Sequence, residues 1–332
     1  MKSTLHCELM LSGFARRRGL RFDEAPALRS LLRHALPEKA FAEDGTAAWL
    51  CRRFGVTRQQ DWPAGPYAAL GDGLPGNDGY WLCADPVSLV LQRDSFSLAE
   101  STPVLQLGQA RQLTEALNDH FAADGMRFHA AAAPRWYLRL ARRPDLLTTP
   151  LAHAMGRDIQ PRMPQGADGL KWHGLLNELQ MLLHAHPVND DLEQQGNLPV
   201  NSVWPWGGGV MNPGAPQPDQ AVWTDDSLAR GLSLAHGSRT APLPGSAGEW
   251  LQQAGLSPRH LVVLPPLATD QPQALQQLDE GWFAPLASLL RQGNIARVTL
   301  HLAGETVKSF TVTRHDFLKF WRRARPLESY LG

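Results

Sequence analysis

The second half of the chain alternates strand-like with helix-like segments, and this alternation is the feature that most constrains the fold. Strand-like runs lie near residues 200–206 and at QAVWTDD (220–226), RHLVVLP (259–265) and ARVTLHLAG (296–304). Segments with the 3.6-residue apolar spacing of helices separate them. A last strand, TVKSFTVTR, and a helix, HDFLKFWRRAR, close the chain. This order predicts an α/β fold with a layered mixed sheet in the second half.

The first half has a different character. It opens with two helix-like segments, 23–36 and 44–55. A pair of strand-like segments follows at 79–85 and 87–98, then a third helix at 108–125, and then a second strand-like pair at 126–131 and 135–141. Hairpins packed on helices predict an α+β N-terminal region. The Pro-, Gly- and Asp-rich segment 142–169 is expected to join the halves. We therefore predict two domains, residues 1–150 and residues 151–332, within the 332-residue chain.

Composition excludes several classes of partner. The formal net charge is +0, which favours neither nucleic acid nor a membrane surface as a partner. Cys7, Cys51 and Cys83 form no CxxC pair, so a disulfide framework or zinc knuckle is not expected. Without a signal-peptide pattern or a long apolar run, we expect a cytoplasmic protein. FLKFWRRARP (317–326) fits either a nucleic-acid stripe or an amphipathic terminal helix, and the zero net charge favours the helix.

A stripe of uncharged polar side chains marks the predicted helix 168–185. His173, Asn177, Gln180 and His184 share one helical face, and His186 and Asn189 extend the stripe past the helix end. Such a stripe fits a buried polar network or the wall of a ligand site, but also a partly exposed helix. The two histidines of the helix lie about 16 Å apart along its axis, too far for one ion to bridge. We therefore expect no metal ion and no cofactor.

The stripe leads into a tryptophan–glycine segment, WPWGGG (204–209). Consecutive glycines allow close backbone approach to a phosphate or to another chain segment. No Gly-Lys-Ser/Thr follows, so a Walker loop is excluded, and a wide turn with tryptophans filling the core is the alternative. Just before it, Asn201 is expected to bond the His186–Asn189 turn. Further on, Asp225 and Asp226 end a strand, where they could hold a metal or cap the next helix.

Two families resemble this sequence. HPVNDDLEQQGNLPVNSVWPWGGG (186–209) resembles the archaeal-type, 2,3-bisphosphoglycerate-independent phosphoglycerate mutases, which carry a His-Pro-Xaa-Asn turn and then a Pro-Ala-Asn strand before a glycine-ended loop. The likeness continues through AVWTDDSLARGLSLAHG (221–237). CRRFGVTRQQDWP, LLNELQMLLHAHPVN, LPVNSVWPWGGG and FWRRARPL are similar to the RpfE-type regulatory proteins, a bacterial group related to the mutases. This second resemblance spans nearly the whole chain.

The mutase resemblance implies an alkaline-phosphatase-superfamily ancestry, with two metal ions, a Ser nucleophile and Asp and His ligands. The sequence lacks that family's N-terminal Asp-Gly turn and its late Asp-Glu-Xaa-Gly-His cluster, and Trp206 stands where the mutases have Arg. The resemblance therefore implies shared descent more strongly than shared catalysis.

These observations predict a phosphoglycerate-mutase-related regulatory or ligand-binding protein without the two-metal centre. An active metal-dependent mutase or phosphatase is one alternative, and an interaction module using Trp204 and Trp206 is the other. The expected partner is a small anionic or phosphorylated ligand, or another protein. The candidate ligand-binding residues are His173, Asn177, His184, His186, Asn189, Asn201, Gly207, Gly208 and Gly209.

Overall fold

The structure is a computed structural model that describes residues 5–13, 24–38, 41–92, 95–267, 273–304, 306–319, 321–323 and 325–331. The chain forms two compact units. Unit 1 consists of Met1–Gly55 and Gly214–Gly332, and unit 2 is the intervening segment Val56–Pro213. Both units combine helices with a sheet, so the predicted α/β class is confirmed.

Unit 1 is built on a mixed sheet, which runs through β11 (Arg239–Ala241), β10 (Gln220–Thr224), β12 (Arg259–Val263), β1 (His6–Leu11), β13 (Arg297–Ala303), β14 (Thr306–Thr313) and β2 (Leu36–Pro37). The strands from β11 to β13 are parallel, whereas β14 is antiparallel to β13. β3 (Phe41–Asp44) also pairs with β14. The sheet is thus mixed, as expected.

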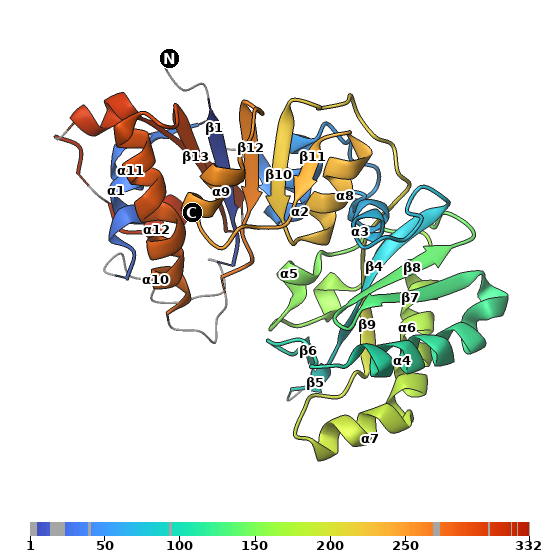
Figure 1. Cartoon of the computed structure of the whole chain (residues 1–332). Helices are drawn as coiled ribbons and strands as arrows, with labels where there is room; N and C mark the ends of the chain where they lie inside the picture. The colour runs from blue at the N-terminus through green and yellow to red at the C-terminus, as the bar shows by residue number, and fades with distance from the viewer. Residues whose placement is uncertain are drawn as a thin grey trace. The chain divides into compact units, whose positions relative to one another are not determined.

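Helices line both faces of this sheet (Figure 1). The main apolar core lies under α1 (Pro26–His34), α9 (Ala247–Gln253), α10 (Ala274–Leu278), a π-helical turn (Asp279–Phe283), α11 (Ala284–Gln292) and α12 (Glu328–Leu331). On the other face, α2 (Gly45–Arg53) and α8 (Ser227–Ala235) pack against each other and against the strands. Residues of β1 are buried on both faces of the sheet: Cys7, Leu9 and Leu11 belong to the main core, and Glu8 and Met10 alternate with them.

Strand β1 was not anticipated, because Glu8 interrupts its apolar run. It lies between β12 and β13 in the sheet (Figure 1). Buried Glu8 is accommodated by Arg53 of α2, whose Nε and Nη2 donate to the carboxylate at 3.0 and 2.9 Å. A buried carboxylate with a two-point guanidinium partner is tolerated, whereas an unpaired one is not.

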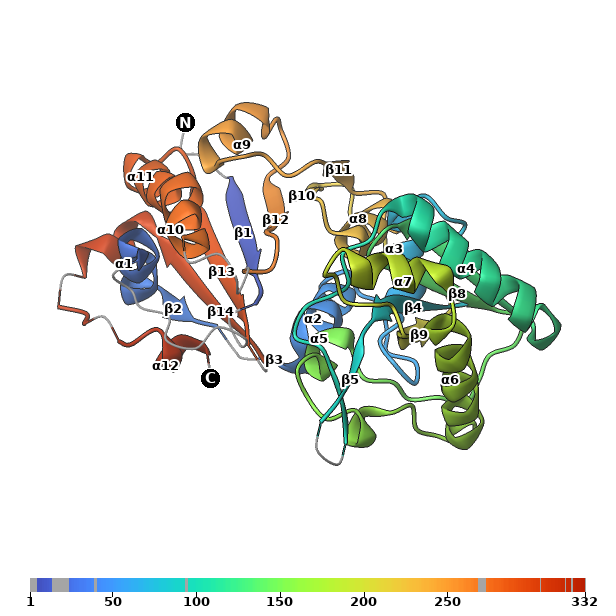
Figure 2. The same cartoon turned by 90° about the horizontal axis from the view of Figure 1, so that it is seen from below.

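Unit 2 contains an antiparallel sheet in the order β7 (Met126–Ala132), β8 (Arg135–Leu140), β4 (Tyr80–Val87) and β9 (Ser202–Gly209). A separate hairpin joins β5 (Leu89–Leu91) to β6 (Phe96–Leu98). One sheet face forms an apolar core with α4 (Leu107–Phe121), α6 (Gly169–His184) and α7 (Pro187–Gln194). α3 (Ala64–Gly71) packs on β4 and β9, and α5 (Leu151–Ala154) borders a smaller apolar cluster. Figure 2 shows α4 and α6 along this unit.

The observed division differs from the predicted one, which separated residues 1–150 from 151–332. The reason is long-range strand pairing. β1 hydrogen-bonds to β12 and β13, so the N-terminal segment belongs to the same unit as the C-terminal strands. β9 pairs with β4, so part of the predicted second domain completes the sheet of unit 2.

The C-terminal helix was predicted wrongly. A 3₁₀ turn covers Arg314–Leu318, and the next helix is the short α12. Asp316 accepts a hydrogen bond from the Thr313 amide, and Arg322 Nη1 donates to the carbonyl oxygens of His34 and Ala35 at the end of α1. The Thr313–Asp316 pair forms a capping box at the start of the 3₁₀ turn, and the Arg322 bonds tie the segment after the turn to the end of α1. Within the described residues, no helix combines the length and apolarity needed to cross a membrane.

Candidate functional site

The glycine segment of the predicted site is the end of a strand, which differs from both the ligand-binding loop and the wide turn that was its alternative. Gly207–Gly209 form the end of β9, which pairs with β4. The register shifts where Trp81 pairs with Gly209 but Cys83 pairs with Trp206, so one extra residue is accommodated. Gly207 has a φ of +65°, which is the left-handed backbone that favours glycine. The first glycine therefore makes a β-bulge.

The other two glycines provide space for neighbouring elements. A Cβ on Gly208 would lie 3.0 Å from ring carbons of the buried Tyr80, and overlap its hydroxyl oxygen. A Cβ on Gly209 would overlap Pro63, immediately before α3. The triple glycine therefore lets β9 pack tightly against Tyr80 and the start of α3. This packing accounts for the glycines without a bound phosphate.

A carboxylate that the sequence interpretation missed lies beside Trp206. Asp85 of β4 is half-buried, and its Oδ2 accepts a 2.6 Å hydrogen bond from the Trp206 indole. Burial raises the pKa of the Asp85 carboxyl to about 7, although the Trp206 bond and the charge of Arg135 oppose the shift. A carboxylate within the apolar run YWLCADPV was the available signal. The single donor of Trp206 is thus already used.

The nearby guanidinium is also engaged. Arg135 Nε and Nη2 donate to the two carboxylate oxygens of Asp72 at 2.8 and 3.1 Å. The Tyr137 hydroxyl donates to the same carboxylate at 2.8 Å. Asp72 caps the end of α3, so this cluster joins the helix to β8. Arg135 therefore makes two hydrogen bonds to the Asp72 carboxylate, which reduces its capacity to bind an anionic ligand.

A second polar connection supports the bulge. The Thr148 amide donates to both carboxylate oxygens of Asp61 at 3.1 Å, and the Thr148 hydroxyl also donates to Asp61. The Gly207 amide in turn donates to Thr148 Oγ1 at 3.1 Å. Burial raises the pKa of Asp61, and the Thr148 hydrogen bonds counteract part of that rise. Trp204 is 3% exposed, and its indole donates to the Thr149 carbonyl.

The predicted stripe on α6 lies mostly at the surface. Asn177 and His184 are exposed, and His173 is half-buried with Nε2 2.9 Å from the Pro164 carbonyl oxygen. Trp172, Leu176, Leu179 and Leu183 form the buried face of this helix. The structure therefore realises the partly exposed helix, which was the alternative to a buried ligand wall.

The remaining polar residues of the predicted site stabilise the backbone. His186 Nδ1 accepts from the Val188 amide and caps α7, a helix that was expected to be a turn. Asn189 is buried. Its side-chain Nδ2 donates to the carbonyl oxygens of Leu183 and Val200, and its Oδ1 accepts a hydrogen bond from the backbone amide of Val200. The link between the helix end and the strand start exists, but Asn189 makes it.

Asn201 does not bond the His186–Asn189 turn as predicted. Its side chain accepts from the Leu89 amide at 2.7 Å and donates to the Leu89 carbonyl at 2.9 Å. The Asn201 carboxamide thus bonds both backbone groups of Leu89 in β5, as the backbone of a paired strand would. His186 and Asn189 lie together at α7, whereas the Asn201 side chain is directed to the hairpin. The nine predicted residues therefore do not converge on a common ligand.

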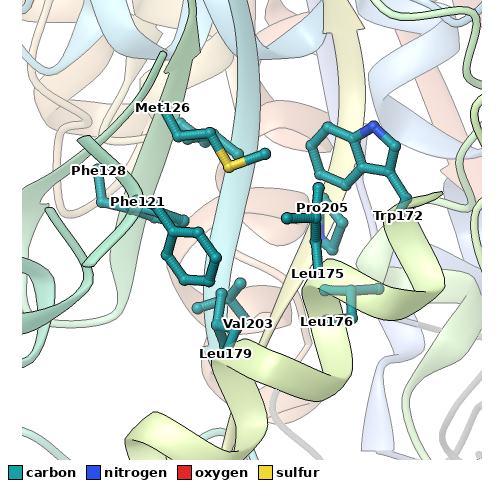
Figure 3. A pocket seen from close by; sticks show the side chains of 10 residues that line it. Phe121, Met126, Phe128, Trp172, Leu175, Leu176, Leu179, Val203 and Pro205 are labelled. Carbon is teal, nitrogen blue, oxygen red and sulfur yellow. The ribbon is translucent and has the colours of Figure 1, made fainter. Parts of the chain in front are cut away.

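An apolar hollow lies between α4, α6 and the sheet of unit 2 (Figure 3). Trp172, Leu175 and Leu179 of α6 face Phe121 and Phe128 across it, with Val203 and Pro205 of β9 behind. It is a shallow packing gap with room for about one water molecule. A lining without acidic, basic or amide side chains suits packing and cannot orient a phosphorylated ligand.

In unit 1, the carboxyl ends of the parallel strands form the edge where ligands of open α/β sheets bind. Asp225 and Asp226 follow β10. Asp226 Oδ1 accepts from the Ala229 amide at 2.8 Å, which confirms its capping role in α8. Asp225 Oδ1 accepts from the Leu243 amide at 3.3 Å.

The ends of β1 and β12 at this edge contribute backbone and apolar groups. β1 leads into Ser12 and Gly13, and the Leu267 amide after β12 donates to the Ser12 carbonyl at 2.8 Å. A Cβ on Gly13 would lie 2.5 Å from the Leu267 nitrogen, so the two segments are in tight contact. Among the described residues, no three His, Cys, Asp or Glu side chains are grouped to hold a metal ion. The donor set present there does not fit a two-metal centre.

Known proteins resemble this chain over part of its length. The 2,3-bisphosphoglycerate-independent phosphoglycerate mutase of Methanothrix thermoacetophila is 31% identical over 110 residues, which are 31% of this chain and 28% of that enzyme. The Methanosarcina acetivorans enzyme of the same name is 26% identical over 192 residues, 54% of this chain and 46% of that enzyme. The matched regions thus span less than half of each relative. No family model matches the chain.

Solved structures resemble it over most of its length. The PH0037 protein of Pyrococcus horikoshii matches with a TM-score of 0.53 and 13% identity, over 94% of this chain and 88% of that one. A cofactor-independent phosphoglycerate mutase from Thermoplasma acidophilum gives a TM-score of 0.48 at 16% identity. Over the matched regions the sequence is thus similar to 2,3-bisphosphoglycerate-independent phosphoglycerate mutases, and the chain shares its fold with the P. horikoshii protein.

Proposed function

We propose that this protein is a regulatory or ligand-binding relative of the phosphoglycerate mutases that does not carry out two-metal phosphoryl transfer. The observation that carries the proposal is the carboxyl edge of β1, β10 and β12. There Asp226 caps a helix, Asp225 accepts a backbone amide, and Leu267 packs on Gly13. Two-metal catalysis needs several anionic or imidazole ligands converging on ions about 3.5–4 Å apart. The sequence segments that follow β1 and β12, residues 14–23 and 268–272, contain Asp23 and Asp270 but no His or Cys.

The surroundings of Trp206 support the same proposal. By resemblance, this position carries Arg in the mutases, and an arginine offers five N–H donors to a phosphoryl group. Trp206 offers one, which Asp85 already accepts at 2.6 Å. The small anionic or phosphorylated ligand expected from the sequence thus remains a prediction without a located site. A regulatory role of the RpfE type rests on the sequence resemblance alone.

An active mutase or phosphatase is the second candidate. Asp225 favours it, because this exposed carboxylate lies at the strand edge where ligands of α/β sheets bind. The interaction module built on Trp204 and Trp206 is less favoured, because Trp204 is buried and the Trp206 indole is hydrogen-bonded.

A metal and turnover experiment separates the first two candidates. The purified chain is incubated with Mn²⁺, desalted and analysed for bound metal, and its interconversion of 3- and 2-phosphoglycerate is measured beside a methanogen mutase. We expect less than one Mn²⁺ per chain and no turnover above the protein-free rate. Two bound ions together with turnover that Asp225→Asn abolishes would establish the active enzyme instead. Titration with inorganic phosphate, followed by melting temperature, tests the anionic ligand, and a saturable rise would support it.

A further inference from the structure

The outward face of α6 carries a continuous line of uncharged side chains, which we name the α6 seam. Its members follow a four–three–four–three spacing: Leu170, Gly174, Asn177, Met181 and His184. All five are exposed, and the two large apolar ones strongly so, Leu170 at 85% and Met181 at 75%. The outer face of a surface helix normally carries charged residues. Unit 2 already holds α6 through the opposite face, so its fold does not explain the seam.

The spacing of the seam matches the core positions of a two-helix coiled coil. In that geometry, the seam residues of one helix pack between those of another. Gly174 lies in the first half of α6, and among the described residues outside its own helix nothing lies within 4 Å of the position its Cβ would take. A second helix can therefore approach closely there, with Leu170 and Met181 as apolar anchors on either side. Figure 2 shows α6 along the outside of unit 2.

Charges beside the seam select the partner. Lys171 and Glu178 flank it on the same side, and both are exposed. They are seven residues apart, about 10 Å along the helix. If a second α6 packs antiparallel about a two-fold axis near residue 175, Lys171 of each copy meets Glu178 of the other. The same axis places Leu170 opposite Met181 and Gly174 opposite Asn177. A parallel pair would not bring the opposite charges to the same level.

We propose that two copies of this chain associate through antiparallel packing of their α6 seams. The face is self-complementary in charge and in shape, which is the requirement for a two-fold interface. Within its own chain, Glu178 Oε1 also accepts a hydrogen bond from His120 Nε2 at 2.7 Å. A carboxylate has capacity for both donors, so the internal contact orients Glu178 without blocking the second copy. Because a single pair of 16-residue helices makes a small interface, the dimer should be weak and form at micromolar concentrations.

Sedimentation equilibrium over a rising concentration series tests the proposal. The wild-type mass should increase from 36.6 kDa toward twice that value. Met181→Lys should reduce association at least tenfold, because it replaces an apolar anchor on each copy with a charge that faces Leu170 of the other copy. Leu256→Lys is the matched control, because Leu256 is fully exposed in unit 1 and outside the seam. It should dimerise like the wild type. Circular dichroism confirms that both variants are folded.

A charge-exchange series tests the antiparallel register. Lys171→Glu and Glu178→Lys should each weaken the dimer, since each creates two like-charge contacts. The double variant should recover it, because the opposite charges meet again. Three results would overturn the proposal: a chain that remains at 36.6 kDa throughout, a Met181→Lys variant that dimerises normally, or single reversals that leave association unchanged.

Discussion

At the scale of single residues, Asn189 is the polar side chain on which the α7 region depends most. Its buried amide satisfies the Leu183 carbonyl and both backbone groups of Val200. Asn189→Ala removes the bonds to both backbone groups of Val200, whereas the Leu183 carbonyl keeps its bond from the His186 amide. We expect a loss of about 2–3 kcal/mol and a melting temperature lower by several degrees. Asn201→Ala removes two contacts with Leu89 in a half-buried place and should cost about 1–2 kcal/mol.

Asn177→Ala is the control for both substitutions, because Asn177 is an exposed residue of α6. It should change stability by less than about 0.5 kcal/mol. Equal melting temperatures for the Asn189 and Asn177 variants, measured by differential scanning calorimetry, would contradict the assigned role of Asn189.

Asp85 should make the stability of the protein depend on pH. Its folded-state pKa, about 7, lies above the unfolded value of an aspartate, about 3.9. The stability linked to the protonated carboxyl is therefore full below about pH 4 and is lost as the pH rises through 7. Asp85→Asn keeps an acceptor for Trp206 without the charge.

We expect Asp85→Asn to melt like the wild type at pH 4 and several degrees higher at pH 8. Thermal melts across this pH range check the expectation. Asp78→Asn is a matched control, because that aspartate is half exposed and paired with Arg139. A constant difference between Asp85→Asn and wild type at all pH values would refute the assigned titration.

At the scale of elements, the junction of β9 with Tyr80 and α3 needs its glycines. Gly208→Ala would place a methyl group against the buried Tyr80 ring, so strand or ring must move. We expect a loss of about 1–3 kcal/mol, the usual effect of overpacking. Gly108→Ala in α4 is the control, since its Cβ would meet no atom within 4 Å and alanine is the better helix former. Chemical denaturation compares the two, and an unaffected Gly208→Ala would show that Tyr80 can move aside without cost.

At the scale of the whole molecule, residues 56–213 form an insertion whose ends lie close together. The Gly55 carbonyl oxygen is 3.0 Å from the Cβ position of Gly214, where the chain returns to unit 1. Each unit has its own apolar core. We expect a fragment of residues 56–213 to fold alone, with a cooperative melt and dispersed amide resonances in a proton–nitrogen spectrum. The fragment 1–150, cut at the predicted boundary, should not, because it lacks β9, α6 and the partners of β1.

The sequence by itself determined the features that depend on neighbouring residues. Apolar periodicity located β10, β12 and β13 and the helices α4 and α6, and the Asp226 cap of α8 followed from local chemistry. In the candidate site, the sequence located the strand that leads into Gly207–Gly209. It also predicted a side-chain link between the end of α6 and the start of β9, but it assigned that link to Asn201, whereas Asn189 makes it. Local patterns define which residues share a face, but not what covers it.

Tertiary structure alone decided the rest. β1 pairs with β12 (His6 with Arg259) and with β13 (His6 with Arg297), which lie far along the chain, so no local pattern could place it or the true unit boundaries. Whether the α6 stripe is buried or exposed depends on which face the sheet covers, and the sheet covers the leucine face. The glycines are explained only by Tyr80 and Pro63, which come from elsewhere in the sequence. The physical reason is the same each time: the free energy of burial depends on the partner surface, and long-range pairing supplies that surface.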